Sequence, residues 1–295
     1  MIGSHDPGVA VTESGAVRSS FDSRDKLLLA GLLAVLAGIL VDLARAWWSS
    51  DHMSHGFLVP VVAYLVAAGR GRELELTPAR SEPIGLVALA VALIVALGGW
   101  LMSSLTVAGV GVVASVAALV WFRRGRAWLV ALAFPLAYLL FMVPPPDEWH
   151  GPLVNWLQAW ASIRSVEVLY ALGVPVFLNG FVIEMAGGQV EVAEACSGAT
   201  SLYTLSALGV LLAFMSLKRR RTRAALIALV LPAALVGNLA RVVVTVLLCL
   251  ELGIERATSG WIHTALGLSI YVVAVGLLLA ADAGLRVYEK RLARA

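Results

Sequence analysis

The chain has 295 residues, of which 60% are hydrophobic and only 14% are charged, with a formal net charge of +3. A soluble globular protein has about 45–50% apolar and about 25% charged residues, so this composition excludes an ordinary soluble domain and indicates a polytopic membrane protein. With only two cysteines, a disulfide scaffold or a cysteine-rich metal site is excluded as well.

Residues 1–26 are polar and lack the apolar core of a cleavable signal, so we expect them to form a disordered cytoplasmic tail. Residues 27–285 are the expected transmembrane domain, and residues 286–295 are a basic cytoplasmic tail. Within the domain, apolar runs predict an all-α transmembrane bundle of about eight spans. The runs are 27–46, 57–68, 84–103, 105–122, 127–143, 197–217, 224–250 and 262–283. The second run is short for a bilayer core of about 30 Å.

Lys and Arg fall in every second gap between these runs, at 70–72, 123–126 and 218–223, and in both tails. By the positive-inside rule, these gaps and both termini are cytoplasmic and the other gaps are external. The alternation agrees with eight spans and disagrees with seven or nine. We therefore expect a multi-pass protein of the plasma (inner) membrane, with the basic clusters setting its orientation and not binding nucleic acid.

The long external segment 144–196 opens with three prolines. Its first half, 153–172, mixes apolar and polar residues, which favours an external helix lying in the interface. Its second half, 174–192, combines Val, Ile and Phe with Gly and Asn turns, which predicts a short hairpin. Six tryptophans fall in the expected external gaps, as in an interfacial aromatic belt.

Three reactive side chains are expected at the external face. Cys196 immediately precedes run six, and a nearby helix N-terminus lowers a thiol pKa. Arg241 lies inside run seven, where an unpaired guanidinium costs at least about 2.5–3.5 kcal/mol, and Asn238 shares its helix face. His263 opens run eight, where an imidazole can transfer protons. A thiol, an imidazole and a hydrogen-bond donor for an oxyanion are the minimum set for acyl transfer at a peptide carbonyl.

The sequence resembles the exosortase/archaeosortase family of membrane cysteine transpeptidases. The resemblance rests on Glu-Ala-Cys-Ser-Gly at 194–198, Gly-Asn-Leu-Ala-Arg-Val at 237–242, His263 with Gly267, the stretch from His55 to Pro60, and the proline-rich segment at 144. It covers residues from about 45 to 283.

The resemblance implies an enzyme that recognises membrane proteins with a C-terminal sorting signal, made of a short motif, an apolar helix and a basic cluster. Cys196 would attack the backbone carbonyl near the motif, His263 would shuttle the proton, and Arg241 would stabilise the oxyanion or position the substrate. The acyl group would pass to an amine or another acceptor on a glycan or lipid, or to water, with no cofactor and no metal. Supporting or substrate-binding roles fall to Asn238, Glu194, Ser197, Gly198 and His55. Family members often carry a bulky aliphatic residue or Arg after Cys-Ser-Gly, whereas Ala199 and Thr200 follow here, so the resemblance does not assign the subfamily or its sorting motif. The sequence does not reveal the acceptor or the oligomeric state.

Other interpretations of these residues stay open at this point. Cys196 fits a packing cysteine or a disulfide with Cys249. Arg241 fits a pair with a carboxylate or a lipid headgroup. His52 and His55 with Asp51 have the composition of a small metal cluster.

Two other functions also stay open. They are a non-enzymatic transporter and an acyltransferase directed at a glycan or lipid. A transporter is disfavoured because the chain has no two-half symmetry and because Arg241 is the only charge that the pattern buries.

Overall fold

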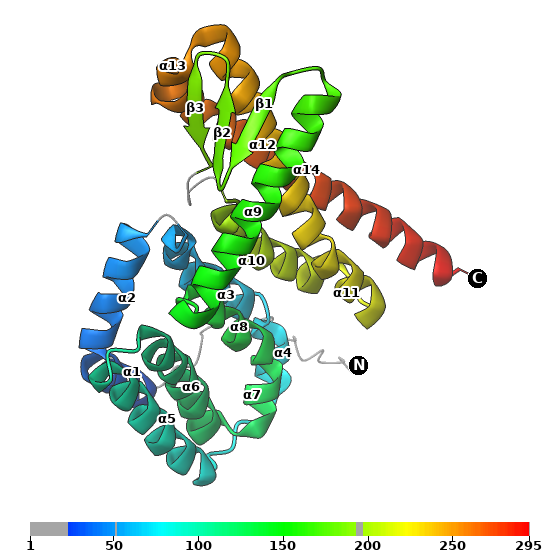
Figure 1. Ribbon diagram of the computed structural model, residues 1–295. Coiled ribbons are helices and arrows are strands. Elements are labelled where there is room, and N and C mark those ends of the chain that lie inside the picture. Colours follow the sequence, from blue (N-terminus) through cyan, green and yellow to red (C-terminus); the bar gives the residue numbers. More distant parts are fainter. Residues whose placement is uncertain (1–22, 51, 193–196, 295) are drawn as a thin grey trace, which may run out of the picture. The chain divides into compact units, whose positions relative to one another are not determined.

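The computed structural model describes residues 23–50, 52–192 and 197–294, apart from the side chains of Arg24, His263 and Ile270 (Figure 1). Most of the expected N-terminal tail, together with Glu194 and Cys196, lies outside the described residues. The chain divides into two units, Met1–Val35 and Leu36–Ala295. The first contains the helix α1 (Ser23–Val35), and the second contains every other element.

The second unit is helical nearly throughout. Its first half comprises α2 (Ala37–Ser49), η1 (Ser54–Phe57), α3 (Leu58–Ala68), α4 (Gly71–Leu76), α5 (Ile84–Leu101), α6 (Leu105–Arg124), α7 (Arg126–Ala131), α8 (Ala133–Tyr138) and η2 (Leu139–Met142). Its second half comprises α9 (Asp147–Ala171), β1 (Val176–Asn179), β2 (Val182–Met185), β3 (Gly188–Glu191), α10 (Ala199–Ser216), α11 (Arg220–Ala228), α12 (Val230–Leu252), α13 (Ile254–Thr258) and α14 (Gly260–Leu292).

The apolar runs of the sequence are helical, which confirms the all-α membrane fold class. Within the described part of the chain, five helices are long and apolar enough to cross a membrane, or six if α1 and α2 form one span. The five are α5, α6, α10, the pair α11 and α12, and α14. The helices at 54–68 and 133–142 are shorter than a span. The expected number of eight spans therefore stays a prediction.

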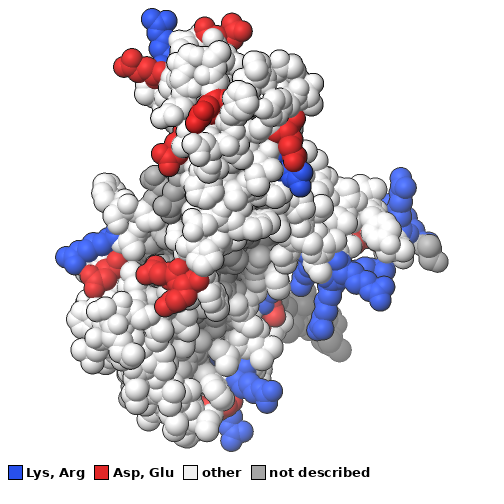
Figure 2. Space-filling model, viewed as in Figure 1, with Lys and Arg blue, Asp and Glu red and all other residues white. Residues whose placement is uncertain are grey.

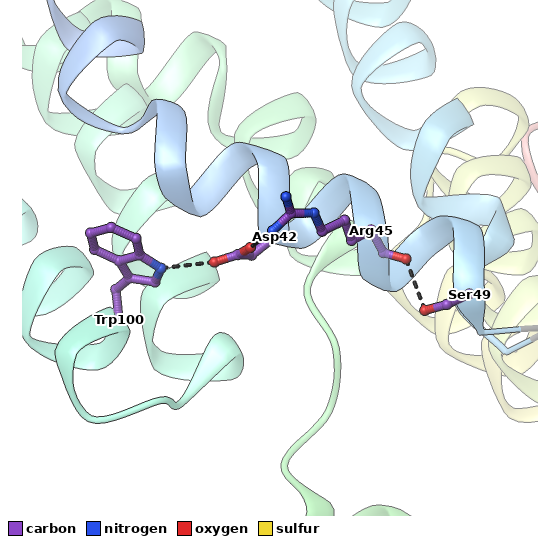
Figure 3. A network of polar contacts seen from close by, with 4 residues as sticks. All are labelled: Asp42, Arg45, Ser49 and Trp100. Atoms are coloured by element: carbon purple, nitrogen blue, oxygen red, sulfur yellow. Dashed lines mark hydrogen bonds and ion pairs between the residues drawn. The ribbon is translucent and has the colours of Figure 1, made fainter.

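Small residues let α5 and α6 pack with their backbones in contact. A Cβ atom added to Gly99 would lie 2.6 Å from the backbone nitrogen of Ala108. The side chain of α5 residue Trp100 turns to α2, where its indole N–H donates to Asp42 at 2.9 Å. Asp42 also accepts from Arg45 at 3.0 Å, so one carboxylate joins the two helices (Figure 3). Such polar contacts and close small-residue packing are typical of helices associating in a membrane.

The external helix expected at 153–172 corresponds to α9, which begins earlier, directly after the three prolines. One stripe of α9 is buried, including Leu157, Ala161 and Leu169, and the helix packs along α12. Pro152 is the sixth residue of α9 and lies inside the helix, where it cannot donate the usual hydrogen bond to the carbonyl of Glu148.

The expected hairpin is part of a three-stranded antiparallel sheet in the order β1-β2-β3. β2 pairs with β3 through Ile183 opposite Val190, so the Gly-rich segment after Met185 is a second turn and not the end of the sheet. Val176 and Ile183 join Val242 and Val246 in one buried cluster. The sheet therefore packs against α9 and α12. In the sequence, it directly precedes the segment that leads into α10.

Helices α10, α12 and α14 pack against one another. At the far end of α14, Asp282 is only 2% exposed and pairs with Arg286 at 3.0 Å and with the hydroxyl of Ser216. The expectation that Arg241 is the only buried charge is therefore wrong, because periodicity did not reveal that Asp282 faces α10. Figure 2 shows Lys and Arg gathered over α11 and the C-terminal end of α14, whereas acidic side chains gather over the sheet and α13.

Candidate active site

The chain enters α10 through a glycine that lies directly against α12. Gly198 has a φ of +90°, which an L-residue rarely adopts, and a Cβ atom there would lie 2.9 Å from Cγ of Asn238. Ser197, only 1% exposed, accepts the backbone N–H of Ala199 at 3.2 Å on its hydroxyl oxygen. The residues that follow position 196 are thus fixed by a buried hydroxyl and by the Asn238 side chain.

Asn238 and Arg241 lie one turn apart on α12 and line a common small cavity. Ser201 of α10 and Gly267 and Tyr271 of α14 line it too. Its volume is about 20 Å³, which is enough for about one water molecule. Three helices therefore converge on a polar point between Asn238 and the guanidinium of Arg241.

The third helix reaches this cavity through Gly267. A Cβ atom on Gly267 would lie 3.5 Å from Nη2 of Arg241, which is ordinary van der Waals distance, so the guanidinium lies next to α14 at this position. His263 precedes Gly267 by four residues in the same helix. Residues four apart share a helix face, about 6 Å along the axis, so position 263 lies on the α14 face that meets Arg241.

The segment before the expected nucleophile is held from the other side by α9 and the sheet. The backbone N–H of Val192 donates to the carbonyl of Phe181 at 2.8 Å. Its carbonyl accepts from the side-chain amide of the buried Gln158. Val192 and Ser197, the described residues on either side of positions 193–196, are both buried. Cys196 and Glu194 themselves lie outside the described residues.

His55 does not line the cavity of Arg241. Its Nε2–H donates to the carbonyl of Phe141 at 3.1 Å, and burial lowers the pKa of its imidazole. It lines a second cavity of about 500 Å³ between η1, α3, α8, α10 and α14, whose walls are mostly apolar and include Ser201 and Tyr271. These two residues also border the cavity of Arg241, so His55 is a neighbour of the site across a larger cavity.

Two of the alternative interpretations involve residues that the structure describes in part. Cys249 is buried in α12 as a free thiol, whereas Cys196 lies outside the described residues. His52 hydrogen-bonds to the hydroxyl of Thr200 on α10 at 2.6 Å, and His55 hydrogen-bonds to the carbonyl of Phe141. Asp51, the third residue of the expected cluster, lies outside the described residues, so the metal interpretation stays a hypothesis.

Sequence reasoning missed a second polar group beside α10. The rings of His52 and His150 lie 5.2 Å apart, and Nδ1 of His150 hydrogen-bonds to the Tyr203 hydroxyl at 3.0 Å. Both hydroxyl partners, Thr200 and Tyr203, lie in the first two turns of α10. The signal in the sequence was a histidine in the first turn of the helix that follows the three prolines.

The sequence matches the transmembrane exosortase family over residues 47–280, which includes α10, α12 and the part of α14 that carries His263, Gly267 and Tyr271. Comparisons with curated proteins and with solved structures give no match. The matched region covers most of the chain and contains Cys196, Asn238, Arg241 and His263. The protein therefore belongs to the transmembrane exosortase family.

Proposed function

We propose that this exosortase-family protein is a cysteine peptidase or transpeptidase that cleaves a C-terminal sorting signal from exported membrane proteins. Cys196 is the nucleophile, His263 transfers protons, and Arg241 with Asn238 stabilises the oxyanion. The substrates carry a short motif, an apolar helix and a basic cluster, as the family resemblance implies. The acyl group held on Cys196 then passes to an acceptor or to water.

The observation that carries this proposal is the contact between the start of α10 and α12. Gly198, two residues after Cys196, lies on Asn238, and Asn238 shares a cavity with Arg241 and the α14 face that includes position 263. Three motifs separated by up to 67 residues of sequence therefore converge, as a nucleophile, an oxyanion donor and a proton carrier require.

The chemistry follows from this arrangement. Cys196 precedes the N-terminus of α10, whose partial positive charge favours the thiolate. Its sulfur attacks the carbonyl carbon, and the oxygen that becomes negative is stabilised by the donors of Arg241 and Asn238. His263 gives a proton to the leaving amine, which releases the C-terminal tail and leaves a thioester on Cys196.

The proposed site faces the outside of the plasma (inner) membrane, and both termini are cytoplasmic. The separation of basic residues over α11 and the end of α14 from acidic residues over the sheet and α13 supports this orientation (Figure 2). The matching test places one cysteine at a time in a variant without Cys196 and Cys249. An impermeant maleimide added to intact cells should label Glu255→Cys and not Arg221→Cys, and the reverse pattern would refute the orientation.

The activity is tested by co-expressing the protein with a reporter that ends in a sorting tail. Wild type should release the tail, and Cys196→Ser should not, because a hydroxyl is a much weaker nucleophile at neutral pH. Cys249→Ser removes the other thiol, which is buried in α12 and does not line the cavity of Arg241, and serves as the control. Tail release by Cys196→Ser at the wild-type rate would refute the proposal.

A further inference from the structure

A separate polar cavity of about 540 Å³ lies beside the first turns of α10. It is bordered by the end of α2, the turn between α5 and α6, and the beginning of α9. We call it the His52–His150 pocket, after the two histidines that line it together with Asp147, Glu148 and Tyr203. Its volume lies within the range of about 300–1,000 Å³ that is usual for small-molecule sites.

The pocket is connected to α10 by hydrogen bonds and not only by packing. His52 bonds to the Thr200 hydroxyl at 2.6 Å, and His150 bonds to the Tyr203 hydroxyl at 3.0 Å. Thr200 and Tyr203 are four and seven residues after Cys196 in the chain. Ser201, between them, borders the cavity of Arg241 instead. The first turns of α10 therefore border two polar cavities.

The charge of the pocket indicates which ligand it suits. Asp147 and Glu148 are its only Lys, Arg, Asp or Glu residues among the described lining. Both are exposed in the first turn of α9. A formally anionic pocket attracts an ammonium group and repels a phosphate or carboxylate. Imidazole is also the side chain that accepts protons near neutral pH, which an ammonium must lose before it can attack.

We infer that the His52–His150 pocket binds a primary amine and that this amine is the acceptor of the acyl group. The acceptor role rests on the proposed function, whereas amine binding in the pocket does not. The bound ammonium gives one proton to an imidazole, and the imidazole passes this proton to water. The amine nitrogen then attacks the thioester carbon, the C–N bond forms and the C–S bond breaks. The second nitrogen proton goes to the leaving Cys196 sulfur, so the enzyme returns as the free thiol.

Binding is tested without catalysis, on the full chain carrying Cys196→Ala in detergent micelles. An alkylamine bearing a diazirine is photolysed, and the labelled peptides are identified by mass spectrometry. We expect labels at 46–53, 102–106 and 144–150. Ethanolamine should suppress them, whereas ethylene glycol, the same molecule with a hydroxyl in place of the amine, should not.

The matched variants test whether the pocket charge is responsible. Asp147→Asn with Glu148→Gln should lower the labelling about tenfold, whereas Glu191→Gln, which removes an exposed carboxylate from β3, should leave it unchanged. Labels outside the pocket, equal suppression by ethylene glycol, or no effect of the double variant would each overturn amine binding at this site.

The acceptor role is tested with the active protein and a peptide that carries a sorting tail. The ratio of amide to acid product is measured against ethanolamine concentration, which normalises for the rate of tail release. The double variant at Asp147 and Glu148, and His150→Asn, should each lower this ratio about tenfold. An unchanged ratio in a protein whose pocket is labelled would overturn the acceptor role. A wild type that releases no tail would refute the proposed function and leave the labelling result as the test of the amine site.

Discussion

Replacing Gly198 with alanine tests whether the contact between α10 and α12 sets the geometry of the active site. At a φ of +90°, an alanine costs about 1–2 kcal/mol in backbone energy. Its Cβ would also lie 2.9 Å from Cγ and 3.2 Å from Nδ2 of Asn238, whereas carbon atoms prefer about 3.5–4.0 Å. Either Asn238 or the start of α10 must therefore move by about 0.5–1 Å, and a misplacement of about 1 Å can reduce a rate about 100-fold.

The matched control is Gly187→Ala in the turn before β3. Gly187 has a φ of +94°, and a Cβ atom there would meet nothing within 4 Å. Both variants should lose a similar free energy of unfolding from backbone strain, measured by denaturant titration in detergent. Only Gly198→Ala should also lose about 100-fold in the rate of tail release by reconstituted protein. Equal rates in the two variants would show that the Gly198 contact does not position the catalytic groups.

Three further predictions concern the same site. Arg241→Lys should slow tail release by about 100-fold or more, because one ammonium cannot replace the planar, five-donor guanidinium, and near-normal release would mean that only positive charge is needed. Gln158→Leu should lower the free energy of unfolding by about 1–3 kcal/mol, since it leaves the Val192 carbonyl buried without its donor, and an unchanged denaturation midpoint would contradict this. Cys196→Ala and His263→Ala should each nearly abolish release, and the double variant should be little worse than either, because groups that act together lose activity non-additively. If the double variant instead loses activity by the product of the two single losses, the two residues act in separate steps.

The helical membrane fold and much of the candidate site follow from local patterns. Length and hydrophobicity predict the long helices. The three-residue spacing of Asn238 and Arg241 predicts that they share a helix face, and the structure has them in one cavity. The glycine at 198 was recognised only as part of a motif. Its physical role, the close approach to Asn238, depends on how α10 crosses α12, which local sequence patterns do not specify.

The features that the sequence did not reveal are contacts between residues far apart in the chain. Thr200 and His52 are separated by 148 positions, and no periodicity pairs residues so far apart. The third strand was missed because Gly187 and Gly188 indicate a loop, whereas the pairing of Val190 with Ile183 extends the sheet. The burial of Asp282 likewise depends on its facing the hydroxyl of Ser216.

The most direct test of the central claim is the mass of the intact protein during turnover. Full-length protein is mixed with a substrate that carries a sorting tail, quenched in acid and measured by mass spectrometry. The account predicts a transient adduct equal to the substrate without its tail, located on Cys196, released by hydroxylamine as expected for a thioester, present in Cys249→Ala and absent from Cys196→Ala. Tail release by wild type with no adduct on Cys196, or with an adduct on another residue, would contradict it.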